Sequence, residues 1–218
     1  KAKSIEAARR AKGKIVIATF YPRDVDRIRT FLEVAKAAER KYVLQSKTAH
    51  LLLSLANDPR IQVPDVLRDP DILVYDRQMD RQASWEASLF AQVGERVVTS
   101  EYVRTHQEEL LVQLDFWVLQ ELIDIQPAPG SPFIHSKSEP IEEDDEVELA
   151  LRNWIRFFRL RRHQFHASGH MSEREISEMI RKIRPRAVIP VHTEHPERFT
   201  RFASRVFSPE RDVPIDVS

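Results

Sequence analysis

The sequence contains no cysteine, and only four of its 218 residues are glycine. Without cysteine the chain can form neither a disulfide bond nor a thiolate metal site, so nitrogen or oxygen atoms would have to hold any metal. No apolar run of about 18 residues and no signal peptide is visible, so a membrane partner is not predicted. We therefore expect a cytoplasmic protein.

An excess of charge of one sign is also missing, since 34 basic residues balance 34 acidic ones. Bulk attraction of a nucleic acid is not predicted, and any RNA contact has to be local. Hydrophobic residues make up 42% of the chain and charged residues 31%, which is typical of a folded globular protein. A chain of this length can form one large domain or two lobes.

Short apolar runs alternate with helical patterns along the first half of the chain. The run at 14–19 is apolar throughout its centre, as expected of a strand that is buried on both faces. Similar strands are predicted at 42–45, 71–75, 96–99, 110–116 and 133–138. The alternation predicts right-handed crossovers and an α/β fold with a mainly parallel, Rossmann-like sheet.

Two short histidine clusters form the chemical centre of the sequence: H-A-S-G-H at 166–170 and H-T-E-H at 192–195. Ser172 and Glu175 have the spacing of a capping box, which predicts that a helix begins between the clusters. The apolar run 187–191 is predicted to be a strand that ends at the second cluster. Because ligands gather at the carboxyl edge of α/β sheets, both clusters could face one cleft. The alternative is a coincidence of polar loop residues.

These two runs resemble the end of a β-CASP nuclease of the metallo-β-lactamase superfamily, to which ribonuclease J and the nuclease subunit of the cleavage and polyadenylation factor belong. In that family the second histidine of the first run is motif B, which matches His170. The histidine after the last strand is motif C, which matches His192. Members that act on RNA carry histidine at motif C and DNA-repair members typically carry valine, so the resemblance implies RNA as the partner.

The resemblance also implies a role for each residue of the two clusters. The activity would be hydrolysis of RNA phosphodiester bonds by a ribonuclease that holds two zinc ions. His192 would be a zinc ligand, and Glu194 would orient it. His170 would donate a proton or a hydrogen bond to a phosphate oxygen. His166 and Ser168 would contact a neighbouring phosphate.

The family's H-x-H-x-D-H metal motif, a further histidine and an aspartate precede its inserted β-CASP domain, and none of them matches this chain. The resemblance implies a β-CASP domain at 1–152 and the returning segment of the metallo-β-lactamase domain at 153–218. We therefore expect this chain alone to hold an incomplete zinc site and to be inactive, with the activity belonging to a longer parent protein. A homodimer is one possible assembly.

The predicted strand at 133–138 ends in two hydroxyls and a lysine, which belong to Ser136, Lys137 and Ser138. Such a strand end before a helix N-terminus can hold a phosphate, because hydroxyls and free N–H groups converge there. The β-CASP family has a hydroxyl-rich strand end at about this point. The alternative is a capped helix beside the acidic run 142–146, which would repel a phosphate.

Five arginines precede the first histidine cluster, at positions 152, 156, 159, 161 and 162. They could follow an RNA backbone, or they could form a solvated basic face that balances the acidic run. Besides the ribonuclease, two other functions remain open: a non-catalytic α/β module that binds RNA or a nucleotide, and a scaffold lobe for assembly. An H-x-H-x-D-H run upstream of Lys1 would favour the enzyme.

Overall fold

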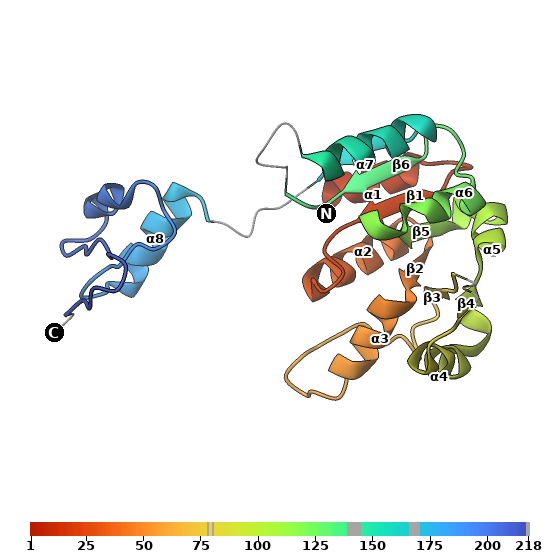
Figure 1. Ribbon diagram of the computed structural model, residues 1–218, viewed down its shortest axis with the longest axis horizontal. Coiled ribbons are helices and arrows are strands. Elements are labelled where there is room, and N and C mark those ends of the chain that lie inside the picture. Colours follow the sequence, from red (N-terminus) through yellow and green to blue (C-terminus); the bar gives the residue numbers. More distant parts are fainter. Residues whose placement is uncertain (78, 80, 139–144, 166–170, 217–218) are drawn as a thin grey trace. The chain divides into compact units, whose positions relative to one another are not determined.

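The computed structural model describes residues 1–77, 79, 81–138, 145–165 and 171–216. The chain divides into two compact units, Lys1–Ala167 and Ser168–Ser218. Figure 1 shows the first unit as a sheet with helices on both faces, and the second unit around helix α8 (Glu173–Ile183).

The first unit is built on one parallel sheet, which confirms the predicted fold class. Its seven strands, counted over the described residues, lie in the order β4-β3-β2-β5-β1-β6-β7, and every neighbouring pair is parallel. The strands are β1 (Val16–Thr19), β2 (Lys41–Gln45), β3 (Ile72–Tyr75), β4 (Val97–Val98), β5 (Leu110–Gln113), β6 (Pro132–His135) and β7 (Arg161–Gln164).

One face of the sheet is covered by helices that arise between β1 and β4 or precede β1. They are α1 (Ala2–Arg10), α2 (Val25–Ala37), α3 (Ser46–Leu55) and α4 (Ser84–Val93). Their apolar residues share one core with Val16 and Ala18 of β1 and with Leu44 of β2. The Asp24 side chain begins α2 by accepting a hydrogen bond from the Arg27 amide at 3.0 Å, as a cap residue should.

The opposite face is covered by helices that follow β4, β5 and β6. They are α5 (Ser100–Thr105), the 3-10 helix η3 (Phe116–Glu121), α6 (Leu122–Ile125) and α7 (Glu146–Phe157), with short 3-10 turns η1 (Gly94–Arg96) and η2 (Gln107–Glu109) nearby. Ile15 and Ile17 belong to this second core, while Val16 belongs to the first. This alternation follows from the two-residue period of a strand, and it explains why the β1 run is apolar at successive positions.

The two structural units divide at 167/168, which is later in the chain than the predicted domain boundary at 152/153, because β7 belongs to the first unit. Arg161 to Gln164 pair in parallel with Pro132 to His135, so β7 is an edge strand of the first unit's sheet. Helix α7 also crosses the predicted boundary without a break. The assignment of 1–152 and 153–218 to two family domains stays a prediction.

The second unit contains the helix that the capping-box spacing predicted. The Ser172 hydroxyl accepts a hydrogen bond from the Glu175 amide, and the Glu175 carboxylate accepts one from the Ser172 amide, at 3.3 and 2.8 Å. The helix ends at Ile183, and Arg184 follows with φ of 52°, before Pro185. A 3-10 helix, η4 (Pro196–Arg201), follows the second histidine cluster.

The prediction of a strand at 187–191 is wrong. Only Val188 pairs, in an isolated parallel bridge with Val206, and Ile189 and Val191 are 40% and 70% exposed. The described C-terminal residues 213–216 form no strand either. Both runs have strand-like composition, but a strand forms only where a partner offers a row of hydrogen bonds.

Candidate functional site

The carboxyl ends of the parallel strands meet at one edge of the first unit's sheet. Neighbouring strands β1 and β5 continue into crossovers on opposite faces, since α2 leads from β1 to β2 and α6 leads from β5 to β6. Figure 1 shows α2 and α6 on the two sides of the sheet. Open α/β sheets bind ligands outside the strand ends at such a switch point.

Three side chains meet at this switch point, each two residues beyond a strand end. The Lys137 ammonium lies 3.8 Å from an Asp115 carboxylate oxygen and 5.3 Å from the centre of the Tyr21 ring. Tyr21 is 55% exposed. Trp117 is 75% exposed, and its amide donates to the Asp115 carboxylate at 3.4 Å. We call Tyr21, Asp115, Trp117 and Lys137 the switch-point cluster.

The switch-point cluster combines exposed aromatic rings with a cation, although its net charge is low. The rings can stack on bases, and Lys137 can reach a phosphate once it exchanges its contact with Asp115. Our sequence reasoning proposed Lys137 but missed Tyr21, Asp115 and Trp117. A signal for them was present, because each lies at or just beyond the end of a predicted strand.

The three residues predicted to hold phosphate have different environments. Ser136 is buried, and its hydroxyl donates to the Phe165 carbonyl at 2.8 Å, so it joins β6 to the end of β7. Ser138 is exposed. The Asp145 carboxylate accepts the Val147 and Glu148 amides of α7 at 2.8 and 3.0 Å. These amides are therefore engaged as in the capped-helix alternative, and phosphate binding by Ser136, Lys137 and Ser138 stays a prediction.

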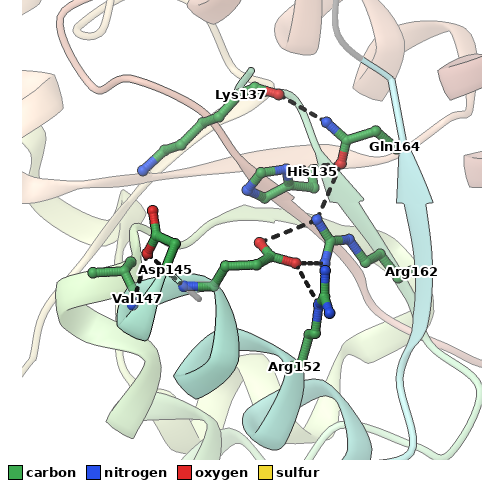
Figure 2. Close-up of polar contacts among 8 residues, drawn as sticks. His135, Lys137, Asp145, Val147, Arg152, Arg162 and Gln164 are labelled. Atoms are coloured by element: carbon green, nitrogen blue, oxygen red, sulfur yellow. Dashed lines mark hydrogen bonds and ion pairs between the residues drawn. The ribbon is translucent and has the colours of Figure 1, made fainter. Parts of the chain in front are cut away.

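His135, at the end of β6, belongs to a polar network that our sequence reasoning missed (Figure 2). The Gln164 amide nitrogen donates to the Lys137 carbonyl at 2.8 Å, so its oxygen faces the His135 Nδ1 atom at 2.9 Å. Nδ1 must then carry the proton, and Nε2 carries the lone pair. Burial lowers the pKa of His135, and the nearby Arg162 charge acts in the same direction, although the contact with Gln164 opposes both. The ring is thus a neutral hydrogen-bond acceptor.

Glu148 of α7 anchors the charged half of the same network. Its carboxylate accepts hydrogen bonds from Arg162 and, at 2.9 Å, from the Arg152 guanidinium. Burial by itself would raise the pKa of Glu148, but the hydrogen bonds and charges of the two arginines outweigh it and hold the pKa below its usual value. Arg162 also donates to the Gln164 oxygen at 3.3 Å. Two of the five arginines considered for RNA contact are therefore already paired within the protein.

The first histidine cluster cannot be placed, because His166, Ser168 and His170 lie outside the described residues. In the second cluster, His192 and Glu194 are exposed, and the contacts of the described residues include none between them. His192 has φ of 57° in an irregular segment, so it does not sit at the end of a strand as predicted. His195 contacts Glu197 at 3.1 Å. The roles predicted for both clusters remain predictions.

The C-terminal part of the chain matches a known protein family. Residues 158–215 match the family described as the Zn-dependent metallo-hydrolase RNA specificity domain (RMMBL). No curated protein matches the chain.

Among solved structures, the chain is similar to a crystal structure of a protein of unknown function from Enterococcus faecalis V583. The TM-score is 0.68 at 19% sequence identity, and the match covers 96% of this chain. It covers 44% of the other chain, so the present chain spans less than half of that protein. At this identity the likeness supports the fold alone.

The described residues do not by themselves provide a zinc site. Over that part of the chain, no group of three or more histidine, cysteine, aspartate or glutamate side chains is close enough to hold a metal ion. A catalytic zinc normally takes three protein ligands and a water. His192 could supply one nitrogen, but no zinc-dependent step follows from these residues alone.

Among the described helices, none combines the length and the apolar character that crossing a membrane requires.

Proposed function

We propose that this chain is the RNA-binding part of a zinc-dependent metallo-hydrolase that cleaves RNA phosphodiester bonds. The observation that carries the proposal is the match of residues 158–215 to the RNA specificity domain of such hydrolases. The β-CASP resemblance of the two histidine runs agrees with it and narrows the activity to a nuclease of the metallo-β-lactamase superfamily. The nuclease would work in the cytoplasm, as part of a longer protein.

The switch-point cluster supports the RNA part of this proposal. Tyr21 and Trp117 offer exposed ring faces to unpaired bases, and Lys137 offers a charge to the backbone between them. Sequence-specific RNA recognition commonly uses stacking of this kind on single strands. A net charge of zero leaves stacking and local contacts, rather than bulk attraction, to provide the affinity.

Residues of the histidine clusters would complete the site in the longer protein. His170 would donate a proton or a hydrogen bond to the phosphate, and His166 and Ser168 would hold a neighbouring phosphate. His192, oriented by Glu194, would give one zinc ligand. The exposed side chains of Ile189 and Val191 are in keeping with a longer protein, in which a further strand would cover them.

RNA binding by the purified chain tests the first half of the proposal. Trp117→Ala should weaken binding of a short single-stranded RNA by about 5- to 100-fold, the range expected for one stacked base, whereas Trp117→Phe should retain most of the affinity. Lys137→Ala should lower the slope of affinity against salt by about one, and Lys12→Ala, an exposed lysine elsewhere, should not. Equal binding by Trp117→Ala and the unchanged chain would contradict the switch-point site.

Cleavage by the longer protein tests the second half. His170→Ala should leave the zinc content unchanged and lower the rate by roughly 10²- to 10⁴-fold, as expected for loss of a general acid. His192→Ala should lower both zinc content and rate. RNA binding without any chelator-sensitive cleavage would favour the alternative, a non-catalytic RNA-binding module.

A further inference from the structure

β7 presents different side chains to the two faces of the sheet, because alternate residues of a strand point in opposite directions. Arg162 and Gln164 face α7 and belong to the Glu148 network. Arg161 and His163 face α1 instead, and they pair in register with Pro132 and Ile134 of β6. The α1 face of β7 therefore forms a separate polar surface, which the switch-point cluster and its network do not use.

A pocket of about 350 Å³ lies on this face. Its charged and titratable lining comes from three parts of the chain: Lys3, Glu6 and Arg10 of α1, Lys14 before β1, and Arg161 and His163 of β7. We call it the α1 pocket. Its volume lies within the range of pockets that hold small molecules.

Positive charge dominates the α1 pocket. Among its described lining residues Glu6 is the one acid, and it pairs with Arg10 at 2.6 Å. Within the described part of the chain, Lys3, Lys14 and Arg161 have no carboxylate partner. Three uncompensated cations in one concave surface repel each other, and a bound anion would remove that repulsion.

Two aromatic rings also line the α1 pocket, beside the charged residues. His163 and Phe165 form adjacent rings with centroids 5.3 Å apart, and both line the pocket. Burial, followed by the neighbouring Arg161 charge, lowers the pKa of His163. The imidazole is therefore neutral near pH 7 and can contact an organic group beside the cations.

We propose that the α1 pocket is a second binding site, specific for a phosphate group carried by a nucleotide or by an RNA backbone. Lys14 and Arg161 hold the phosphate oxygens, Lys3 adds charge from the side of α1, and the two rings contact the attached nucleoside. The proposal stands on the pocket's charges and shape, so it does not depend on the proposed nuclease function.

Calorimetric titration of the purified chain with inorganic phosphate, adenosine monophosphate and a short RNA without terminal phosphates tests the site. The double variant Lys14→Ala with Arg161→Gln should weaken adenosine monophosphate binding by at least about 10-fold, since two charge-assisted contacts are lost. The control, Lys12→Ala with Arg68→Gln, removes the same charge from exposed positions outside the pocket and should change affinity by less than about 2-fold.

The ligands separate the two sources of phosphate. A greater loss of monophosphate affinity than of RNA affinity in Lys14→Ala with Arg161→Gln assigns the site to nucleotides, and the reverse assigns it to the RNA backbone. The comparison uses losses in this variant because RNA bound at the switch-point cluster would not respond to it. Equal losses in the two double variants, or no saturable binding of any ligand by the unchanged chain, would overturn the proposal. Circular dichroism of each variant confirms that it is folded.

The pKa of His163, measured by nuclear magnetic resonance with and without ligand, provides a second test. A ligand-dependent rise in this pKa would not result from loss of folding. The charged groups that face this ring are Lys3, Glu6, Arg10, Lys14 and Arg161. A phosphate placed among them should raise the pKa of His163, because an anion favours the imidazolium. The rise should appear in the unchanged chain and in the control variant and be lost in Lys14→Ala with Arg161→Gln. A His163 pKa that saturating ligand does not move would contradict the site.

Discussion

The two faces of β7 differ in whether their arginine is paired with a carboxylate, although the two arginines are adjacent in the strand. On the α7 face, Arg162 is paired with Glu148 and hydrogen-bonded to Gln164. On the α1 face, Arg161 has no carboxylate partner among the described residues and lies in a pocket with Lys3 and Lys14. The first arrangement is satisfied within the protein, so it stabilises the fold. The second has no carboxylate partner among the described residues, and the proposed anion would supply one.

The largest expected effect is that of Glu148→Gln on the α7 face. The change leaves Arg162 beside a buried neutral group and should lower the free energy of unfolding by about 2 kcal/mol. This value is smaller than that of a fully buried ion pair, because the second partner of Glu148, Arg152, is half exposed. Urea unfolding followed by circular dichroism measures it. Glu146→Gln, an exposed neighbour on α7, should cost less than about 0.5 kcal/mol. Equal costs for the two variants would remove the distinction between the faces.

Arginine substitutions on β7 sharpen the comparison further. Arg162→Gln should lower the free energy of unfolding by about 1 kcal/mol, because it breaks the pair with Glu148. Arg161→Gln should leave it unchanged or raise it by a few tenths of a kcal/mol, because it relieves repulsion in the α1 pocket. The same urea experiment compares them. A greater loss for Arg161→Gln would mean that its charge is satisfied inside the protein.

Acid should weaken the α7 face before the Glu148 carboxylate titrates. Burial lowers the pKa of His135 below its ordinary value of 6.5, so the unfolded chain binds a proton more readily than the folded one. The contribution of His135 to stability is therefore complete above about pH 6.5 and is lost as the pH falls through the folded-state pKa. His135→Gln should reduce the loss of stability between about pH 7.5 and pH 5.5.

His163 on the other face has the same direction of shift and is the necessary control. His163→Gln should remove its own share of the pH dependence, and the double variant should remove both. If His135→Gln leaves the pH profile unchanged, the ring is not held neutral by its burial.

Salt should have the smallest effect, and it should act on the α1 face. Raising sodium chloride from about 50 mM to about 500 mM screens the repulsion among Lys3, Lys14 and Arg161 and should stabilise the chain by a few tenths of a kcal/mol. In Arg161→Gln the gain should be smaller. Thermal unfolding at matched pH measures both, and a gain that is unaltered by Arg161→Gln would place the repulsion elsewhere.

Much of the first unit could be predicted from local pattern. The β1 run and the alternation of strands with helices led to the correct fold class, because burial on both faces imposes continuous apolar runs. The capping box at Ser172 likewise predicted the start of α8, because its two hydrogen bonds depend on residues only three apart. Helix α5 was missed, since six residues carry too little periodicity.

The second unit shows where local pattern was insufficient. The run 187–191 has the composition of a strand, but only Val188 finds a partner, so the prediction that it carries His192 at a strand end was wrong. The candidate sites show the same limit. His135 and Gln164 are 29 residues apart, and nothing in either neighbourhood indicated that they would meet.

The sequence by itself determined most elements of the first unit and the parallel class of its sheet, because burial periodicity and capping are properties of neighbouring residues. It also carried the two histidine runs on which the resemblance to β-CASP nucleases rests. The tertiary structure decided which charges are paired. Arg161 and Arg162 are identical and adjacent in sequence, and the strand's alternation alone sends one to Glu148 and the other to the α1 pocket. Their different roles therefore come from the long-range packing of α1 and α7 on opposite faces of one strand.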